Sequence, residues 1–599
     1  MTVGGGLINV SMSGTNCNAV ESDQGFIVNG GALAVTASGP QSKGIKTDGD
    51  AVFNGGTLRF NISGDVVLET ATNSASVVYK DPSYSEAVKA SNVVVNAGSF
   101  SVLATGQAGR GFSAERDLTV NGGTFAIVSS GSASATFTNE QSSVDVAAAA
   151  CMKAGRLLTL NGGAFTFSVS GTGGKGFAAD AALLATGGTA DLDLSGAPAF
   201  INHGTYLEPS YCAGVKCGGN AVVSNGTFTI RHTGIAGRGF SVDTNLLVTG
   251  GSFAITTTGT NTAVYTSGVY YVNSVLSNYL DVGAASAIKV DGNMVAGGGT
   301  FDLLSTGCCG KGLNVSGTLT VGTNAIAATP AITARTTGTQ FKISGGTSSG
   351  GGRPGGGGAP PDDTAEYSNP KAIKIQGKFL MNSGSVAAST QNAGGEGIES
   401  KDAIIVNGGT IEATAYNDGI NAETNITFNG GNVFCCSTGD GDGTDSNGTY
   451  IFNGGVIVSL ASLVASEEGL DGGDGYAYTV NGGTFIGVGG TQMLSTPTAG
   501  TQYSLLYTGP LTSNNVMRIT DSSGSVFAFR IPRSYSGNMD MLCSCSGIKS
   551  SGTYSVYTNA SMTTGSAFHG LYTNSVSSAS GGQTRGTVSS KTGMYYKAP

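Results

Sequence analysis

The tripeptide Asn-Gly-Gly, or a close variant of it, returns along almost the whole chain, often at intervals of 25 residues. A repeat of this kind constrains the fold before any local argument, because each repeat must form an equivalent structural unit. Other steps before residue 382 are longer, and the last three are 22, 24 and 28 residues. The clearest copies begin at Asn29, Asn54, Asn121, Asn161, Asn407, Asn429, Asn453 and Asn481.

Apolar residues occupy fixed positions around each tripeptide. One column lies four residues after the first residue of the tripeptide, as at Leu33 and Phe125. Two more columns lie one and three residues before it, as at Val28 and Phe26. Because successive side chains of a strand point to opposite faces, columns at alternate positions predict short strands with one buried face. A second strand is expected after the tripeptide, for example at Thr124–Val128.

The tripeptide itself predicts a tight turn between these strands. Asn tolerates the left-handed conformation, and Gly supplies a positive φ without steric cost. A period near 25 residues without a helical pattern favours a coil that climbs one strand spacing per turn over a hairpin. We therefore predict an all-β fold, a right-handed parallel β-helix, which is a solenoid of about 16 coils. The Asn residues are expected to hydrogen-bond to their equivalents in neighbouring coils.

Composition narrows the function classes. The chain of 599 residues contains 99 Gly and no Trp, and 11% of its residues are charged. Such a composition can indicate disorder, but the stacked apolar columns supply a solenoid core. The net charge of −9 argues against nucleic acid as a partner. No apolar run is long enough to span a membrane.

The ten cysteines and three histidines give little support for a reactive site. No cysteine spacing is typical of zinc, so buried thiols are expected, with a few surface disulfides as the alternative. His203, His232 and His569 lie in unrelated segments, and Ser-His or Cys-His catalysis has no support. We therefore assign no catalytic residue. The chain begins inside a repeat without a visible leader sequence, which indicates a removed leader or a first coil that needs a partner.

Two segments depart from the repeat. Residues 345–363 are rich in Gly and Pro, and we expect a long loop within a β-helix that covers 1–499. Residues 500–599 lose the tripeptide but keep alternating strands, such as Val526–Ile531 and Thr553–Tyr557. This pattern predicts a small C-terminal β domain that caps the exposed sheet edge or serves in assembly.

A column of basic residues precedes the tripeptide on alternate coils of the first part of the chain. It consists of Lys43, Arg110, Lys175, Arg238 and Lys311, each followed by Gly. The longer steps place insertions at the same point of alternate coils, and two of them end in Pro-Ser-Tyr, at Tyr84 and Tyr211. Insertions confined to one face often mark a binding face. Because these side chains can hydrogen-bond or stack on sugars, we predict that they bind carbohydrate, with a solvated edge on which the loops pack as the alternative.

The same column becomes acidic in the last coils. Aligned on a shared Gly, it contains Glu396, Asp418, Asp442 and Glu468, followed three residues later by Glu399, Asn421, Asp445 and Asp471. Stacked coils place such carboxylates about 5 Å apart, which is destabilising unless a cation lies between them. Calcium accepts six to eight oxygen ligands in a flexible geometry, and no His or Cys nearby favours zinc. We predict that these eight residues bind calcium, with a solvated acidic edge as the alternative.

Several segments carry a resemblance to a known family. They are the recurring basic-Gly-Ile/Phe segment followed by NGGTF, Gly395–Gly431, the Gly-rich loop, Phe529–Ser536 (FRIPRSYS) and Phe568–Tyr572 (FHGLY). In these the chain resembles bacterial secreted carbohydrate-binding β-helix proteins, related in fold to pectate lyases. The resemblance covers nearly the whole chain. It implies binding of plant-type or acidic polysaccharides, and bound calcium at the seven acidic residues named above.

Three functions follow as hypotheses. The first is a non-catalytic, calcium-stabilised polysaccharide-binding protein at the cell surface or outside the cell. The second is a structural fibre built by head-to-tail stacking of identical chains, with the C-terminal domain contacting the next subunit. The third is a calcium-dependent polysaccharide lyase, in which a base such as Lys374 or Lys401 abstracts a proton next to a uronate.

Overall fold

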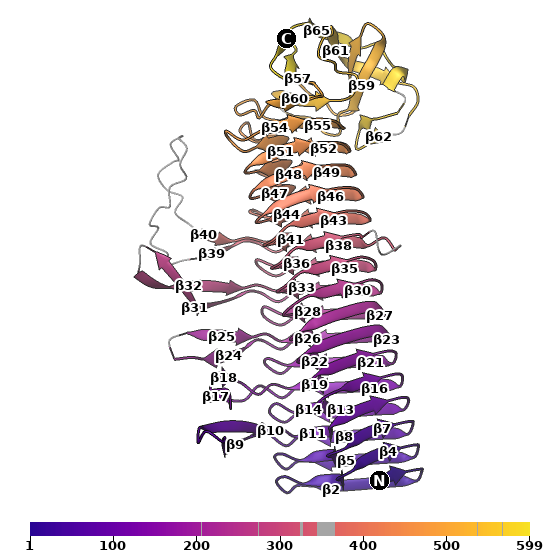
Figure 1. Cartoon of the computed structure of the whole chain (residues 1–599), viewed down its shortest axis with the longest axis vertical. Helices are drawn as coiled ribbons and strands as arrows, with labels where there is room; N and C mark the ends of the chain where they lie inside the picture. The colour runs from indigo at the N-terminus through magenta and orange to yellow at the C-terminus, as the bar shows by residue number, and fades with distance from the viewer. Residues whose placement is uncertain are drawn as a thin grey trace.

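The computed structural model describes residues 1–204, 206–272, 275–323, 328–343, 366–535, 537–565, 567–574 and 576–599. Within these ranges the chain is all-β, without an α-helix and with one 3₁₀ turn, at Val576–Ser578. Figure 1 shows an elongated stack of short strands that rises from the N-terminus toward the C-terminal residues. The predicted loop at 345–363 lies outside these ranges. No helix within them is long and apolar enough to cross a bilayer.

Each repeat contributes strands to three parallel ladders. In an early repeat these are β4 (Gly25–Val28), β5 (Ala32–Ala37) and β6 (Lys43–Thr47). Each strand pairs in parallel with its equivalent one repeat later; for example, β5 pairs with β8 (Thr57–Ile62), which sets Leu33 opposite Leu58. The ladder that contains β6 is a 15-stranded sheet from β3 (Asn18–Ser22) to β53 (Leu470–Gly472). The prediction of an all-β fold is confirmed, and the long parallel sheets are compatible with a β-helix.

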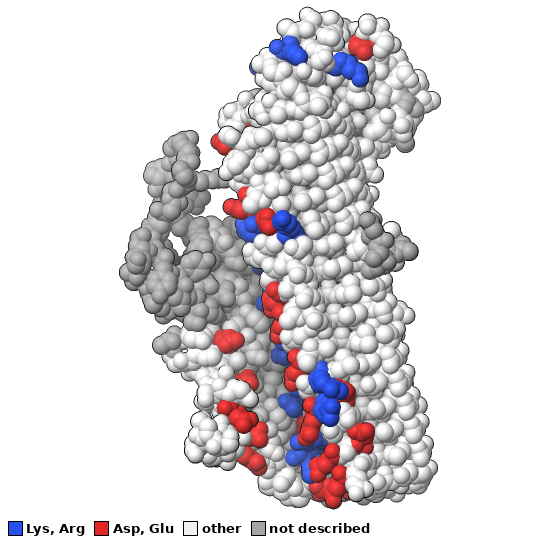
Figure 2. Space-filling model, viewed as in Figure 1, with Lys and Arg blue, Asp and Glu red and all other residues white. Residues whose placement is uncertain are grey.

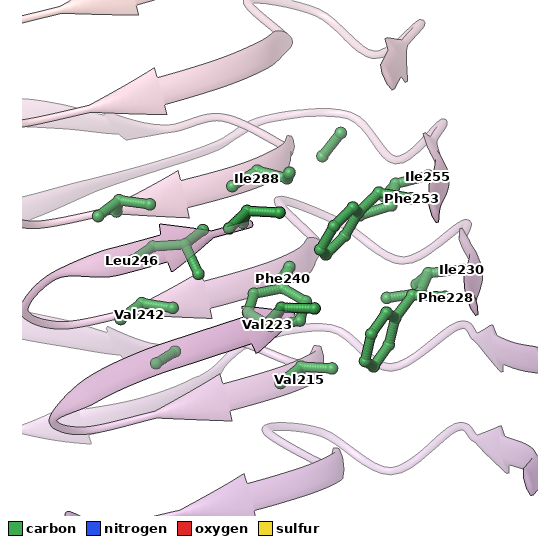
Figure 3. Close-up of a cluster of buried hydrophobic side chains, with 14 of the residues drawn as sticks. Val215, Val223, Phe228, Ile230, Phe240, Val242, Leu246, Phe253, Ile255 and Ile288 are labelled. Carbon is green, nitrogen blue, oxygen red and sulfur yellow. The ribbon is translucent and has the colours of Figure 1, made fainter. Parts of the chain in front are cut away.

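The apolar columns form the core, as predicted. Leu33, Leu58, Phe100 and Phe125 are at most 6% exposed, because their strands alternate between core and solvent. Phe100 and Phe125 stack with ring centroids 4.8 Å apart. Farther along, Phe228 and Phe253 stack in the same manner at 5.4 Å, as Figure 3 shows. Full burial of such a side chain contributes about 1.5–3 kcal/mol to stability, so the stacked columns hold successive repeats together.

The tripeptides form the predicted turns and an exposed ladder of amides. The second Gly has a positive φ, for example 85° at Gly31 and 99° at Gly123, which is why Gly recurs there. The Asn54 side-chain amide donates to Asn29 Oδ1 at 2.8 Å. The Asn121 amide bonds to Asn96 Oδ1 in the same way. The predicted hydrogen bonding between Asn residues of neighbouring coils is therefore confirmed.

The insertions form antiparallel hairpins on one side of the stack, the left side in Figure 1. The first joins β9 (Val67–Thr72) to β10 (Val78–Ser83). Two more join β24 (Ala199–Asn202) to β25 (Leu207–Ser210), and β31 (Thr262–Val272) to β32 (Val275–Gly283). All of them precede strands of the 15-stranded sheet, so they project beside it.

The C-terminal residues continue from the last parallel strands. β60 (Asn538–Ser544) pairs antiparallel with β55 (Thr484–Gly489), the final strand of its ladder. The predicted strand at residues 526–531 corresponds to β59 (Gly524–Arg530), in a separate seven-stranded sheet. Leu505 and Met541 share one apolar cluster with Ile486 of β55. The core thus runs across residue 500, and a domain boundary there remains a prediction.

The cysteines follow the first of the two expectations. All ten are free thiols, and eight of them are buried, whereas Cys17 and Cys308 are half-buried. Burial raises the pKa of the Cys212 thiol to about 11, so it stays protonated at neutral pH. The thiols therefore serve as small apolar core residues.

Candidate functional site

The basic and acidic columns form one continuous line along the 15-stranded sheet. In its register Lys43 lies opposite Glu86, and Glu86 lies opposite Arg110. Farther along, Lys311 lies opposite Lys371, and Lys371 lies opposite Glu396. Asp418 and Asp442 continue this line. They are neighbours, and the Asp442 N–H donates to the Asp418 carboxylate at 2.9 Å. Stacked parallel strands thus bring together residues that are 24 or more positions apart.

Three residues farther along each strand, a second line runs parallel to the first. Glu399 lies opposite Asn421, Asn421 opposite Asp445, and Asp445 opposite Asp471. Toward the N-terminus the same line contains Lys46 and Lys89. The two acidic columns expected from the sequence are therefore adjacent in space, on the last strands of the sheet.

Most members of the basic column are buried and hydrogen-bonded to the backbone. Lys43, Arg238 and Lys311 are 5%, 8% and 8% exposed. The Lys43 ammonium donates to the Gln41 carbonyl at 2.8 Å, and Lys311 donates to the Cys309 carbonyl at 2.8 Å. Lys175 donates to the Gly173 and Tyr211 carbonyls. Burial lowers the pKa of Lys311 to about 7 and that of Lys175 to about 8.

The two insertion tyrosines lie on arginines of the column. The Arg110 guanidinium lies 3.2 Å from the centroid of the Tyr84 ring. The Arg238 guanidinium lies 4.2 Å from that of Tyr211. In both cases the Tyr ends a hairpin and the Arg belongs to the next coil, so a cation–π contact joins the hairpin to the sheet. The geometry gives these rings a structural role, in line with the alternative that the loops pack on this edge, and one face of each ring is already occupied.

A cavity of about 330 Å³ lies between the first hairpin and the sheet. Its charged lining consists of Lys43, Lys89, Arg110, Lys153, Glu69, Asp81, Glu86, Glu115 and Asp180. Several of these are paired: Lys89 with Glu115 at 3.3 Å, Arg110 with Glu86 at 3.7 Å, and Lys153 with Asp180. Figure 2 shows these alternating charges as a recessed band beside the hairpins. We call this cavity the hairpin groove.

Sequence reasoning named only Lys43, Arg110 and Tyr84 of this lining as site residues. Lys89 and Lys153 recur on intervening coils, and that recurrence is the signal by which they can be found. Glu69 and Asp81 lie on the hairpin, outside the repeat, so no periodicity marks them. The other predicted sugar-binding residues, Lys175, Arg238, Lys311 and Tyr211, lie along the same sheet beyond this groove.

Along the 15-stranded sheet, the basic column gives way to the acidic column at a buried network of ion pairs. Lys371, which is 5% exposed, contacts Glu396 at 2.5 Å and Glu399 at 3.5 Å. Lys401 adds a contact to Glu399 at 2.8 Å. Burial acts to raise the pKa of Glu399, but Lys371, Lys374 and Lys401 outweigh it and lower this pKa to about 2. These two predicted calcium ligands therefore already have protein cations beside them. Sequence reasoning missed Lys371, although its Lys-Ala-Ile segment aligns with the Lys-Gly-Leu at Lys311.

The other acidic residues form a tighter group. Asp442, Asp445 and Asp471 are half-buried, and each offers a carboxylate oxygen within 4.8 Å of the others. Burial, followed by the neighbouring carboxylates of Asp418 and Asp471, raises the pKa of Asp442 to about 10. Asn421 donates to the second oxygen of Asp418 at 3.2 Å. Oxygen ligands from two adjacent coils at this spacing fit a calcium ion, which would offset the repulsion between them.

Comparison with known proteins adds a family. A family model described as "Carbohydrate-binding domain-containing protein" matches residues 1–198, 314–443 and 380–592, which together are more than half of the chain. The matched ranges include the hairpin groove and the acidic group. No curated protein and no solved structure matches the chain.

Proposed function

The chain belongs to the family of carbohydrate-binding domain-containing proteins, and on that premise we propose that it is a non-catalytic polysaccharide-binding protein of the cell surface or extracellular space. The single observation that carries this proposal is the hairpin groove, with its charged and hydroxyl-bearing lining beside Tyr84. Such groups exchange hydrogen bonds with sugar hydroxyls, and the groove has a volume within the range of small-molecule sites, roughly 300–1,000 Å³.

The charge balance of the groove favours uncharged, plant-type glycans over acidic ones. Its lining contains four basic and five acidic side chains. The Lys89 and Arg110 cations already contact the carboxylates of Glu115 and Glu86. A polyanion would have to displace these carboxylates, whereas a hydroxyl can donate to a carboxylate and accept from a lysine at the same time.

A binding assay with paired variants tests this proposal. Lys89→Ala removes a half-exposed ammonium from the groove and is expected to weaken binding to a soluble neutral plant polysaccharide at least tenfold in affinity electrophoresis. Lys46→Ala is the matched control, because Lys46 lies on the same line of the sheet but outside the groove lining. Tighter, strongly salt-dependent binding to polygalacturonate would contradict the preference for neutral glycans. Failure to bind any polysaccharide would contradict the function itself.

We also propose that calcium stabilises the protein at Asp442, Asp445 and Asp471, with Asp418 and Glu468 beside them. The spacing of the three carboxylates supports this site. Chelation is expected to lower the melting temperature, and calcium but not magnesium to restore it, because magnesium demands a stricter octahedral geometry. Asp445→Asn is expected to reduce the calcium response, whereas Asp48→Asn, at an exposed position, is the control. An unchanged melting temperature on chelation would contradict the site.

The finer form of the fold belongs to the same proposal. We infer that the three ladders wind into a right-handed parallel β-helix of about 16 coils. The regular step from one repeat to the next in every ladder supports this inference. A low-resolution solution envelope that is elongated, with the hairpins projecting from one side, is the expected outcome.

Neither alternative function gains comparable support. For a lyase, the base Lys401 must lose its proton, but its ammonium contacts Glu399 at 2.8 Å. Burial acts to lower the pKa of Lys401, yet Glu399 outweighs burial and raises it. In a head-to-tail fibre, the last parallel strand of one chain would pair with the next chain. That strand, β55, instead pairs with β60 of the same chain. We therefore keep binding as the proposed activity.

A further inference from the structure

We propose a second glycan site, distinct from the hairpin groove, in a cavity of about 300 Å³ at the C-terminal end of the 15-stranded sheet. This inference rests on the proposed function and extends it to a site for a short, uncharged oligosaccharide. The cavity lies against β53 and β54 (Tyr478–Val480), between the glycine-rich turn at 472–475 and the segment at 493–498. We call it the terminal cavity.

Apolar side chains form the rim of the terminal cavity. Tyr476 is 59% exposed, Met493 is 54% exposed and Leu494 is 37% exposed. All three are exposed large apolar side chains, and they line one cavity. An exposed tyrosine ring beside aliphatic side chains is a suitable surface for the apolar face of a pyranose, because it buries C–H groups and leaves the sugar hydroxyls free.

Polar groups lie next to this rim and are held in place by Ser495. The Ser495 N–H donates to the Glu468 carboxylate at 2.6 Å, and its hydroxyl donates to Asp471 at 3.1 Å. Tyr478 also lines the cavity; it is 3% exposed, and its buried hydroxyl makes no hydrogen bond within the described chain. Its ring packs against those of Tyr450 and Phe452, so Tyr478 belongs to the core beside the cavity.

The charge of the lining decides the class of sugar. The lining contains the carboxylates Glu468 and Asp474 and, among the described residues that form it, no Lys or Arg. A uronate would be repelled, whereas hydroxyls of a neutral sugar can donate to these carboxylates. The volume lies at the lower end of the range for small-molecule sites, roughly 300–1,000 Å³, so the cavity fits a short oligosaccharide rather than a long polymer segment.

Calorimetric titration of the full chain in calcium tests this proposal, with cellobiose and maltose as neutral probes and digalacturonic acid as the acidic one. At least one neutral disaccharide is expected to bind, and more tightly than the acidic one. Tyr476→Ala is expected to weaken that binding at least tenfold, whereas Tyr476→Phe keeps the ring and retains it. Tyr367→Ala, at a tyrosine that is 37% exposed on another strand, is the matched control and is expected to bind as the unaltered chain does.

Two outcomes would contradict a glycan site in the terminal cavity. They are no binding of either neutral disaccharide, or binding that Tyr476→Ala leaves unchanged. Equal or tighter binding of digalacturonic acid would overturn the neutral class. Failure of the proposed function would give a different result. In that case the unaltered chain would bind no polysaccharide in the affinity electrophoresis that tests Lys89→Ala. Since the two cavities have no lining residue in common, each variant tests one site without altering the other.

Discussion

At the scale of single residues, glycine decides how the charged line is built. The Gly that follows each basic residue lies where any side chain would collide with the neighbouring strand or the core. A Cβ at Gly239 would lie 2.3 Å from Ile255 Cγ2 and 2.4 Å from the Ala287 carbonyl oxygen. A Cβ at Gly44 would lie 2.5 Å from the Phe60 ring. The recurring basic-Gly pair is therefore a packing requirement, and it positions the basic side chain at the sheet surface.

Gly239→Ala tests this requirement. The substitution is expected to destabilise the protein by roughly 1–3 kcal/mol, the usual cost of overpacking a core, measured by urea unfolding. The control is Gly5→Ala, because no atom lies within 4 Å of a Cβ at that position. Equal stability of the two variants would show that the strand can shift to accommodate a methyl group.

The buried lysines make stability depend on pH. Folded Lys311 has a pKa of about 7, lowered by burial and by Lys374, against 10.5 for an exposed lysine. Between these values the folded chain binds fewer protons than the unfolded chain, so the contribution of Lys311 to the free energy of unfolding increases as pH rises. Below pH 7 both states are protonated and this contribution no longer changes.

Lys311→Met removes this dependence while keeping the length of the side chain. The stability of the unaltered protein minus that of the variant is expected to rise by on the order of 1 kcal/mol between pH 7 and pH 9. Urea unfolding at both pH values measures the difference, and titration of other groups cancels in it. Lys46→Met is the control, since Glu21 raises the pKa of Lys46 and no rise is expected. A flat difference for Lys311→Met would contradict the assigned burial effect.

At the scale of elements, an aromatic contact helps to join each of two hairpins to the sheet. The hairpin β9–β10 forms its own antiparallel ladder and leads directly into Tyr84, which lies on Arg110 of the next coil. Tyr211 and Arg238 repeat this arrangement after the hairpin β24–β25. The aromatic contact therefore helps to hold the first hairpin beside the hairpin groove.

Tyr84→Leu is expected to loosen the first hairpin by about 1 kcal/mol, the typical strength of such a cation–π contact. Hydrogen exchange of residues 67–83 should become about fivefold faster, whereas exchange in the parallel ladders stays the same. Tyr84→Phe keeps the ring and is expected to behave as the unaltered protein does. Val78→Ala, at a residue of the same hairpin that is 64% exposed, controls for a generic effect of substitution there. Equal exchange in the Leu and Phe variants would assign the hairpin position to its other contacts, such as the hydrogen bond from Gln41 to Glu69.

At the scale of the whole molecule, the C-terminal residues complete the core of the stack. Leu542 of β60 lies opposite Gly487 of β55 and belongs to the same apolar cluster as the stacked columns. Arg533 donates to the Ser437 carbonyl at 2.8 Å, which adds a polar contact between the two parts. The last strands and the C-terminal sheet are thus expected to unfold as one unit.

Leu542→Ala tests this coupling. Loss of this buried side chain is expected to cost about 2–5 kcal/mol, and hydrogen exchange should accelerate in β55 and β60 together. Leu463→Ala, at a leucine that is 56% exposed, is expected to change neither. Faster exchange in β60 alone would mean that the two parts are independent domains, with the boundary near residue 500 that the sequence predicts.

The sequence predicted the site residues that lie within the repeats better than those that lie in the hairpins or after the last repeats. The acidic residues from Glu396 to Asp471 were placed on adjacent coils because they align on a Gly that successive repeats share. Glu69 and Asp81 were not found, since a hairpin outside the repeat brings them to the groove. Ser495 and Tyr476 were missed for the same reason: they follow or interrupt the last repeats, and only folding sets them beside Glu468.

The sequence by itself determined the strands, the turns and their stacking, because in a parallel ladder equivalent residues of successive repeats lie opposite each other. A period of about 25 residues therefore specifies both the contacts and the order of the columns. Only the tertiary structure decided which acidic groups have a cation beside them: Lys371 pairs with Glu396 and Glu399, while Asp442, Asp445 and Asp471 lie close to one another. The physical reason is that these energies depend on burial and on distances of a few ångströms, which periodicity does not encode.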